Sequence, residues 1–264
     1  MGERPVFLTR GYGARMAGPV RVDLSFHRAV DVGDEPLLLA RSYPTIVAQD
    51  RVAGADSAAR TGASVIVMDD GFQNPAIVKD CAVLVVDAGR GIGNRHVVPA
   101  GPLRAGLSTQ LEHAHALLVV GSGEGARDVA VAAGERGLAI FASRLEPHRG
   151  VIARLQRTPV LAFAGIAAPE KFFATLTENG VAVRERREFG DHHRFTDAEA
   201  TRLLNDAEAR QLVLVTTEKD YVRLGQSGAA AALRKRAMAL PVTLVMDDEA
   251  GFGDFMLGQL KASA

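Results

Sequence analysis

The sequence has a single cysteine, no tryptophan and no net charge. With Cys81 as its only cysteine, the chain cannot form an internal disulfide, which fits a reducing cytosolic setting. Acidic and basic residues balance at 31 each, so no overall field favours nucleic acid as a partner. Lysine is scarce beside arginine, so phosphate contacts are expected from guanidinium groups, which bind two oxygens at once.

Long apolar segments are also missing. The first residues, MGERPVFLTRGYG, contain no signal-peptide core, and no apolar stretch approaches the roughly 20 residues of a membrane-spanning helix. The sequence therefore predicts a soluble, cytoplasmic protein without a transmembrane segment. Peripheral contact with a membrane surface is compatible with this prediction.

A third absence concerns nucleotide binding. No Gly-Lys-Ser or Gly-Lys-Thr occurs in the sequence, so it does not contain the phosphate-binding loop G-x-x-x-x-G-K-[ST]. The residues that would bind a nucleotide are therefore unknown from the sequence.

What the sequence does contain is a series of short, apolar, β-branched runs separated by helix-compatible stretches. These runs include PVFLT, TIVAQ, SVIVM, AVLVV, ALLVV, LAIFAS, PVLAFAG, LVLVTT and PVTLVM. Continuous apolarity within the strands, alternating with helices, predicts an α/β fold with a mainly parallel sheet flanked by helices. TDAE, at residues 196–199, is a capping box that predicts a helix start, and a second helix is expected to start at Pro36.

A seam is predicted near residues 145–158, where prolines and charges interrupt the pattern. We therefore expect an N-terminal α/β lobe at residues 1–147 and a smaller C-terminal α/β lobe at residues 158–264.

Two pairs of adjacent acidic residues are candidate site residues. In VIVMDDGFQN, Asp69 and Asp70 end a predicted strand, where ligands of open α/β sheets bind and where a carboxylate can hold Mg²⁺ beside a phosphate. The alternative is a simple turn at Asp70-Gly71 with Asp69 as a cap. Asp34 and Glu35 of VGDEPLLLA are weaker evidence, because the helix dipole alone favours acids at a helix start.

The segment GDHHRFT places Asp191, His192 and His193 directly before the capped helix. A histidine held by a neighbouring carboxylate can shuttle a proton near neutral pH, although a solvated loop explains the segment equally well. The pattern does not decide which histidine would act.

Gly121, Gly123 and Ala126 match G-x-G-x-x-A between a strand and a helix, and Glu146 ends the next strand. This pattern supports an alternative hypothesis, an NAD(P)-dependent oxidoreductase. Such short glycine patterns also arise by chance. A non-catalytic binding protein is the third hypothesis.

Eight stretches together resemble the tetraacyldisaccharide 4′-kinase (lipid A 4′-kinase) family, in that family's order. They are LTRGYGA, VGDEPLLLARS, DRVAGA, VIVMDDGFQN, VVDAGRGIGNRHVVPAGPLRAGLS, AFAGIAAPEKFFATL, FGDHHRFT and LVTTEKDYVRL. The resemblance implies a P-loop NTPase-like kinase that transfers the γ-phosphoryl group of ATP to the 4′-hydroxyl of tetraacyldisaccharide 1-phosphate. It implies action at the cytoplasmic face of the inner membrane, on the path to lipid A.

The resemblance also implies roles for individual residues. Asp34 would activate the sugar hydroxyl with His192 as its partner, and Glu35 and Asp69 would bind Mg²⁺. The candidates for binding the substrate headgroup are Arg10, Gln73 and Arg104.

Two departures from the family pattern stand out. Family members carry an apolar segment and a GGTGKT-like phosphate loop before the stretch that matches the start of this sequence, and Asn74 replaces their usual histidine after DDGFQ. Because the loop neutralises phosphate charge, we expect the 264-residue polypeptide to have impaired kinase activity.

Overall fold

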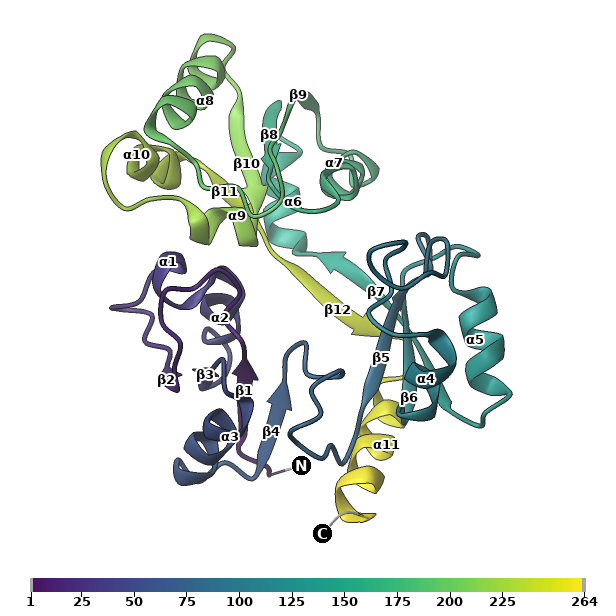
Figure 1. Ribbon diagram of the computed structural model, residues 1–264. Helices are drawn as coiled ribbons and strands as arrows, with labels where there is room; N and C mark the ends of the chain where they lie inside the picture. Colours follow the sequence, from purple (N-terminus) through teal and green to yellow (C-terminus); the bar gives the residue numbers. More distant parts are fainter. Residues whose placement is uncertain (1, 263–264) are drawn as a thin grey trace. The chain divides into compact units, whose positions relative to one another are not determined.

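The computed structural model describes residues 2–262, which form two compact units. The described residues of unit 1 are Gly2, Asp70–Glu146 and 243–262, and unit 2 comprises Glu3–Asp69 and Pro147–Val242. The described residues form three four-stranded sheets, whose strands are labelled in Figure 1. The division into lobes at residues 147 and 158 stays a prediction.

The first sheet of unit 2 contains the N-terminal strands. Its spatial order is β2 (Val20–Arg21), β3 (Thr45–Val47), β1 (Pro5–Thr9) and β4 (Val65–Met68). Strand β1 runs parallel to both β3 and β4, so the carboxyl ends of these three strands share one edge. Leu8 and Ile46 are buried at its centre.

Three helices accompany this sheet: α1 (Ala29–Val32), α2 (Asp34–Leu39) and α3 (Arg51–Arg60). Asp50 caps α3 by accepting a hydrogen bond from the backbone nitrogen of Ala53 at 3.1 Å. Gly54 allows α3 to approach the sheet, because a Cβ at this position would lie 2.5 Å from Cδ1 of Leu8.

The second sheet of unit 2 is fully parallel. Its order is β11 (Met238–Leu240), β10 (Val213–Thr217), β8 (Val160–Ala164) and β9 (Val183–Glu188). The helices around it are α6 (Arg149–Leu155), α7 (Pro169–Glu178), α8 (Asp197–Ala209), α9 (Glu218–Arg223) and α10 (Gly228–Arg236).

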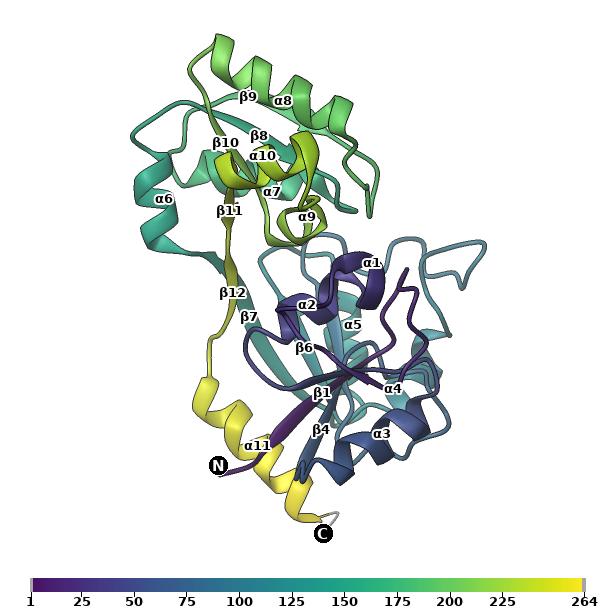
Figure 2. The same cartoon turned by 90° about the vertical axis from the view of Figure 1, so that its left-hand side faces the viewer.

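Strand β8 is buried along its whole length, because its residues alternate between two covered faces. Leu161 and Phe163 pack with residues of α8 and α10, whereas Val160 and Ala162 pack with residues of α6 and α7. Helices therefore lie on both faces of this sheet, as Figures 1 and 2 show. The continuous apolar sequence of this strand follows from this double burial.

Unit 1 contains the third sheet. Its order is β12 (Val242–Met246), β7 (Ala139–Pro147), β6 (Ala116–Val120) and β5 (Val83–Asp87). Its helices are α4 (Leu107–Glu112), α5 (Arg127–Gly134) and α11 (Glu249–Ala262). Leu111 and Val129 pack with Leu117 in one cluster, and the ring of Phe141 contacts Phe252 of α11.

The structure confirms the predicted α/β fold with mainly parallel sheets. It also confirms the capping box, in which Thr196 accepts from the backbone nitrogen of Glu199 at 3.3 Å. The predicted helix start at Pro36 is two residues late, because α2 begins at Asp34. Among the described helices, none is both long and apolar enough to cross a membrane.

Candidate active site

Asp34 opens helix α2, and only 5% of its surface is exposed. The preceding residue, Gly33, has a φ of 96°, a left-handed value that glycine adopts without steric cost. A Cβ on Gly33 would lie 3.2 Å from Cδ of Pro36 and 3.4 Å from Cα of Gly11. Gly33 therefore permits a sharp turn between α1 and α2 and brings the start of α2 against the segment that follows β1.

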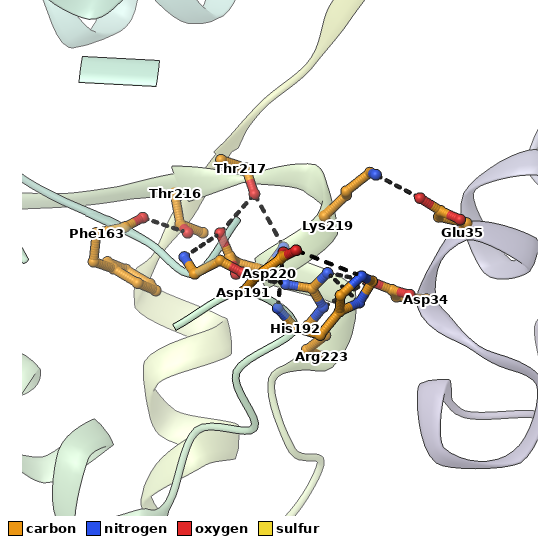
Figure 3. Close-up of polar contacts among 11 residues, drawn as sticks. Asp34, Glu35, Phe163, Asp191, His192, Thr216, Thr217, Lys219, Asp220 and Arg223 are labelled. Carbon is orange, nitrogen blue, oxygen red and sulfur yellow. Dashed lines mark hydrogen bonds and ion pairs between the residues drawn. The ribbon is translucent and has the colours of Figure 1, made fainter. Parts of the chain in front are cut away.

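The partner of Asp34 is Arg223, at the end of α9. Nε of Arg223 donates to Oδ2 of Asp34 at 2.6 Å, and Nη2 pairs with the same oxygen. Nη1 donates to the backbone oxygen of Gly165 at 2.7 Å. Nη1 also donates to Oδ1 of Asp220 at 3.1 Å, and Figure 3 shows Asp220 and Asp34 around Arg223. The side chain of Arg223 is only 5% exposed, so this buried cation is balanced by two carboxylates.

Asp220 is completely buried and holds the start of α9 against β8. Its Oδ2 accepts from the backbone nitrogen of Gly165 at 3.0 Å and from the hydroxyl of Thr217 at 2.7 Å. Thr217 in turn caps α9 by accepting from the backbone nitrogen of Asp220 at 3.1 Å. The position of Arg223 is therefore fixed by a hydrogen-bonded network at the carboxyl end of β10.

His192 lies in the loop between β9 and α8 and has a left-handed φ of 55°. Its Nδ1 is 3.1 Å from Nη2 of Arg223 and 3.6 Å from Oδ2 of Asp34, whereas its Nε2 is 4.0 Å from Oδ2 of Asp191. The ring of Tyr12 lies against the imidazole, with 5.1 Å between centroids. The structure thus brings Asp34 and His192 together around one guanidinium group.

His193 makes a different contact. Its Nε2 lies 3.0 Å from Oε2 of Glu199, the acidic member of the capping box. The backbone N–H of Thr196 is the main cause that lowers the pKa of Glu199 to about 2, and His193 lowers it further. Of the two adjacent histidines, only His192 faces Asp34.

Glu35 also pairs with a residue of α9. Its Oε1 lies 2.5 Å from Nζ of Lys219 (Figure 3). Arg41, just beyond α2, pairs with Glu218 at 3.1 Å. Three ion pairs, including that of Asp34, therefore join the segment around α2 to α9.

Asp69 directly follows β4 and lies at the carboxyl edge of the first sheet. Its Oδ2 accepts from the hydroxyl of Thr9, the last residue of β1, at 3.0 Å, and its backbone oxygen accepts from Nη2 of Arg51 at 2.9 Å. Arg10 follows Thr9 and is exposed. The parallel pairing of β1 with β4 explains why these two strand ends meet.

Glu35 and Asp69 carry the carboxylate oxygens that Mg²⁺ prefers. Among residues 2–262, no group of three or more His, Cys, Asp and Glu side chains is arranged to hold a metal ion. Protein sites usually hold Mg²⁺ by one or two carboxylates, with water and phosphate as the other ligands. The donor chemistry of Glu35 and Asp69 therefore fits Mg²⁺, and the structure leaves their joint role as a prediction.

The remaining predicted headgroup residues, Gln73 and Arg104, belong to unit 1. Nη1 of Arg104 donates to both carboxylate oxygens of Asp70 at 2.8 Å. Nε2 of Gln73 is 3.4 Å from Oε1 of Gln110. Both side chains are exposed, and their substrate contacts stay predictions, as does that of Arg10.

The glycine-rich loop after β6 does not support the oxidoreductase hypothesis. The backbone nitrogen of Gly125 donates to the oxygen of Ala88 at 2.7 Å. A Cβ on Gly123 would lie 3.0 Å from that same oxygen, and a Cβ on Gly125 would lie 2.8 Å from the oxygen of Gly89. Gly123 and Gly125 therefore serve close packing against the loop after β5, rather than the approach of a pyrophosphate.

Sequence reasoning missed Arg223, Asp220 and Lys219. In the sequence, TTEKD indicates only the end of a strand. Its charged residues are typical of the solvated first turn of a helix. Asp220 and Arg223 are three residues apart, which places them on one face of α9. That spacing was the available signal, but it does not reveal the partner on α2.

Comparisons with known proteins show what this chain is similar to. The family model described as LpxK, Tetraacyldisaccharide-1-P 4'-kinase, matches residues 1–261. A protein of Afipia carboxidovorans named Tetraacyldisaccharide 4'-kinase is 50% identical over 261 residues, which cover 99% of this chain and 77% of that protein. A protein of the same name from Rhodopseudomonas palustris (strain BisA53) is 50% identical over 100% of this chain and 77% of that protein. Another, from Bradyrhizobium sp. (strain ORS 278), is 48% identical over 99% of this chain and 78% of that protein.

One solved structure shares the fold. It is the crystal structure of an "apo" form of LpxK from Aquifex aeolicus in complex with ATP. The similarity has a TM-score of 0.72 at 22% identity and covers 98% of this chain and 79% of the other.

Proposed function

This chain belongs to the tetraacyldisaccharide-1-P 4′-kinase family, and from that membership we propose that it transfers the γ-phosphoryl group of ATP to the 4′-hydroxyl of tetraacyldisaccharide 1-phosphate. The product would be lipid IVA, on the path to lipid A. The observation that supports assigning individual residues is that the partly exposed His192 and the buried Asp34 meet beside the buried Arg223.

We assign Asp34 as the base that accepts the proton of the sugar hydroxyl. The hydroxyl oxygen attacks the γ-phosphorus, the bond from this phosphorus to the β–γ bridging oxygen breaks, and ADP leaves with the electron pair. The hydroxyl proton passes to the carboxylate of Asp34 as the new bond forms. His192 is its proposed partner, and the two side chains are joined through Nη2 of Arg223, which contacts both of them.

Glu35 and Asp69 are the residues we propose for holding Mg²⁺. When bound, the ion would neutralise phosphate charge. Support comes from the type of their oxygens and from their positions, at the start of α2 and the end of β4. ATP is proposed as the donor because the fold is that of a kinase crystallised with ATP. The residues that bind ATP are not assigned, since the sequence contains no G-x-x-x-x-G-K-[ST].

Arg10, Gln73 and Arg104 are proposed contacts of the disaccharide headgroup. Arginine suits this task because its fork binds two oxygens of a phosphate. The acyl chains of the substrate would remain in a lipid layer, so we propose peripheral action at the cytoplasmic face of the inner membrane.

The test is an assay of the 264-residue protein with tetraacyldisaccharide 1-phosphate, ATP and Mg²⁺, in which mass spectrometry detects the gain of one phosphate. We expect turnover above the enzyme-free blank, and we expect Asp34→Asn to lower it by about 10²-fold or more. Asp247→Asn is the matched control, because Asp247 makes an exposed ion pair with Arg144. The proposal fails if the protein neither phosphorylates the lipid nor gains thermal stability from it.

A further inference from the structure

We propose that Arg223 is a positioning residue that fixes the carboxylate of Asp34 and holds His192 as a neutral imidazole with its proton on Nε2. The proposal rests on the function above, in which Asp34 and His192 act together. Arg223 acts through these two side chains and needs no contact with the substrate.

Every nitrogen of the Arg223 guanidinium makes a contact. Nε donates to Asp34, Nη1 donates to the backbone of Gly165 and to Asp220, and Nη2 reaches both Asp34 and His192 (Figure 3). A lysine has a single nitrogen on a flexible stem and cannot reproduce this planar set of contacts. The geometry therefore requires the guanidinium and not merely a positive charge.

The contact with His192 determines which ring nitrogen carries the proton. A guanidinium group has only donors, so Nδ1 of His192 must be the acceptor at 3.1 Å. An imidazole that accepts at Nδ1 is neutral and carries its proton on Nε2, which lies 4.0 Å from Oδ2 of Asp191. A doubly protonated ring has no acceptor and cannot make the contact with Arg223.

The competing arrangement would place a proton on Nδ1 and direct it to Asp34. Nδ1 is 3.6 Å from Oδ2 of Asp34, which is longer than a hydrogen bond. Arg223 and Asp34 therefore compete for one ring nitrogen of His192. In this structure the contact of hydrogen-bond length is the one with Arg223.

The same contacts distinguish the two oxygens of Asp34. The hydrogen bond and the ion pair with Arg223 and the contact with His192 use Oδ2. We therefore assign Oδ1 as the oxygen that accepts the proton of the sugar hydroxyl. Asp220 helps to hold Arg223 in place, because it is fully buried and accepts hydrogen bonds from Arg223 and from the backbone nitrogen of Gly165.

The first test does not depend on activity. Long-range ¹H–¹⁵N spectra of the wild-type protein near neutral pH report the protonation of each ring nitrogen, and His192→Gln identifies the signals of His192. We expect an unprotonated Nδ1 and a protonated Nε2, and we expect Arg223→Lys to change this pattern. A wild-type His192 with a proton on Nδ1 would overturn the proposal.

The second test uses kinetics. We expect Arg223→Lys to lower kcat by about 10²-fold, because the reacting carboxylate is no longer held in place, with little change in KM for the lipid. The pH profile of kcat should also change. Arg236→Lys is the matched control, since Arg236 makes an exposed pair with Glu208 and should leave both kcat and the profile unchanged.

The outcomes separate this proposal from the proposed function. Absence of both kinase activity and thermal stabilisation by the lipid in the wild type would contradict the function, while the spectra would still test the tautomer. Full activity and an unchanged pH profile in Arg223→Lys would refute the role of Arg223 and leave the function intact. Circular dichroism checks the fold of each variant, and Asp220→Asn gives a second route if Arg223→Lys does not fold. Asp220→Asn should also lower kcat, and wild-type kinetics in this variant would count against the proposal.

Discussion

Nζ of Lys219 lies 2.5 Å from Oε1 of Glu35, and the two side chains are 44% and 38% exposed. Exposed ion pairs contribute up to about 1 kcal/mol, because water and salt screen them. We therefore expect Lys219→Ala to lower the free energy of unfolding by less than about 1 kcal/mol, measured by urea denaturation. A larger loss would mean that this pair is more important for joining α2 to α9 than its exposure indicates.

The neighbouring pair should behave differently. Asp34 and Arg223 are buried, and removing one partner of a buried pair typically costs about 3–5 kcal/mol. We expect Asp34→Ala to lower the free energy of unfolding by about 3 kcal/mol in the same urea measurement. Glu208→Ala, which removes an exposed partner of Arg236, is the control and should change stability by less than about 0.5 kcal/mol. Equal effects of the two variants would contradict the difference in burial.

Asp69 offers a test of metal binding. If its carboxylate holds Mg²⁺ beside the nucleotide, Asp69→Asn removes a charged ligand from a hard cation. We expect the Mg²⁺ concentration for half-maximal activity to rise by about tenfold or more, while KM for the lipid changes little. A titration of activity with Mg²⁺ measures this, and an unchanged midpoint would exclude Asp69 as a ligand.

Glu199 provides a dependence on pH. Its pKa is lowered from 4.5 to about 2, chiefly by the backbone N–H of Thr196. Because the folded pKa lies below the unfolded one, the carboxylate stabilises the protein above pH 4.5, and this contribution is lost as pH falls towards 2. The stability difference between wild type and Glu199→Gln should therefore be largest near neutral pH and shrink below pH 4.5. Urea denaturation across this range measures it, and a difference that grows with acidity would contradict the sign.

Gly125 tests the packing of the loop after β6. A Cβ there would lie 2.8 Å from the backbone oxygen of Gly89, which cannot move independently of its chain. We expect Gly125→Ala to lower the free energy of unfolding by about 1–3 kcal/mol. Gly134→Ala is the control, because the nearest atom to a Cβ there is 3.8 Å away and alanine favours the helix by up to about 1 kcal/mol. A neutral Gly125→Ala would show that the two loops are not tightly packed.

Much of the fold was predictable because most of its strands are continuous apolar runs. PVLAFAG predicts β8, and the Thr196 capping box predicts the start of α8. Strand β9 was not predicted, since its sequence, VRERRE, carries five charges. It occupies the edge of its sheet, where charged residues are tolerated and prevent pairing with other chains. An edge strand of this kind has no apolar signal in the sequence.

The candidate site was likewise only partly predictable from the sequence. Asp34 and His192 could be proposed as partners from a resemblance, and the structure brings them together although 157 positions separate them in the sequence. The choice between His192 and His193 required the contact of His193 with Glu199. Arg223 could not be proposed, because its role depends on two helices that are distant in the sequence.

The sequence by itself determined the α/β class, most of the strands, the family resemblance and the acidic residues that the proposed chemistry needs. These properties are encoded locally, in runs of apolar residues, in caps and in short motifs. Only the tertiary structure decided how those acids are paired. Packing of α2 against α9 joins Asp34 to Arg223 and His192, and such long-range pairing depends on how helices dock, which local sequence does not specify.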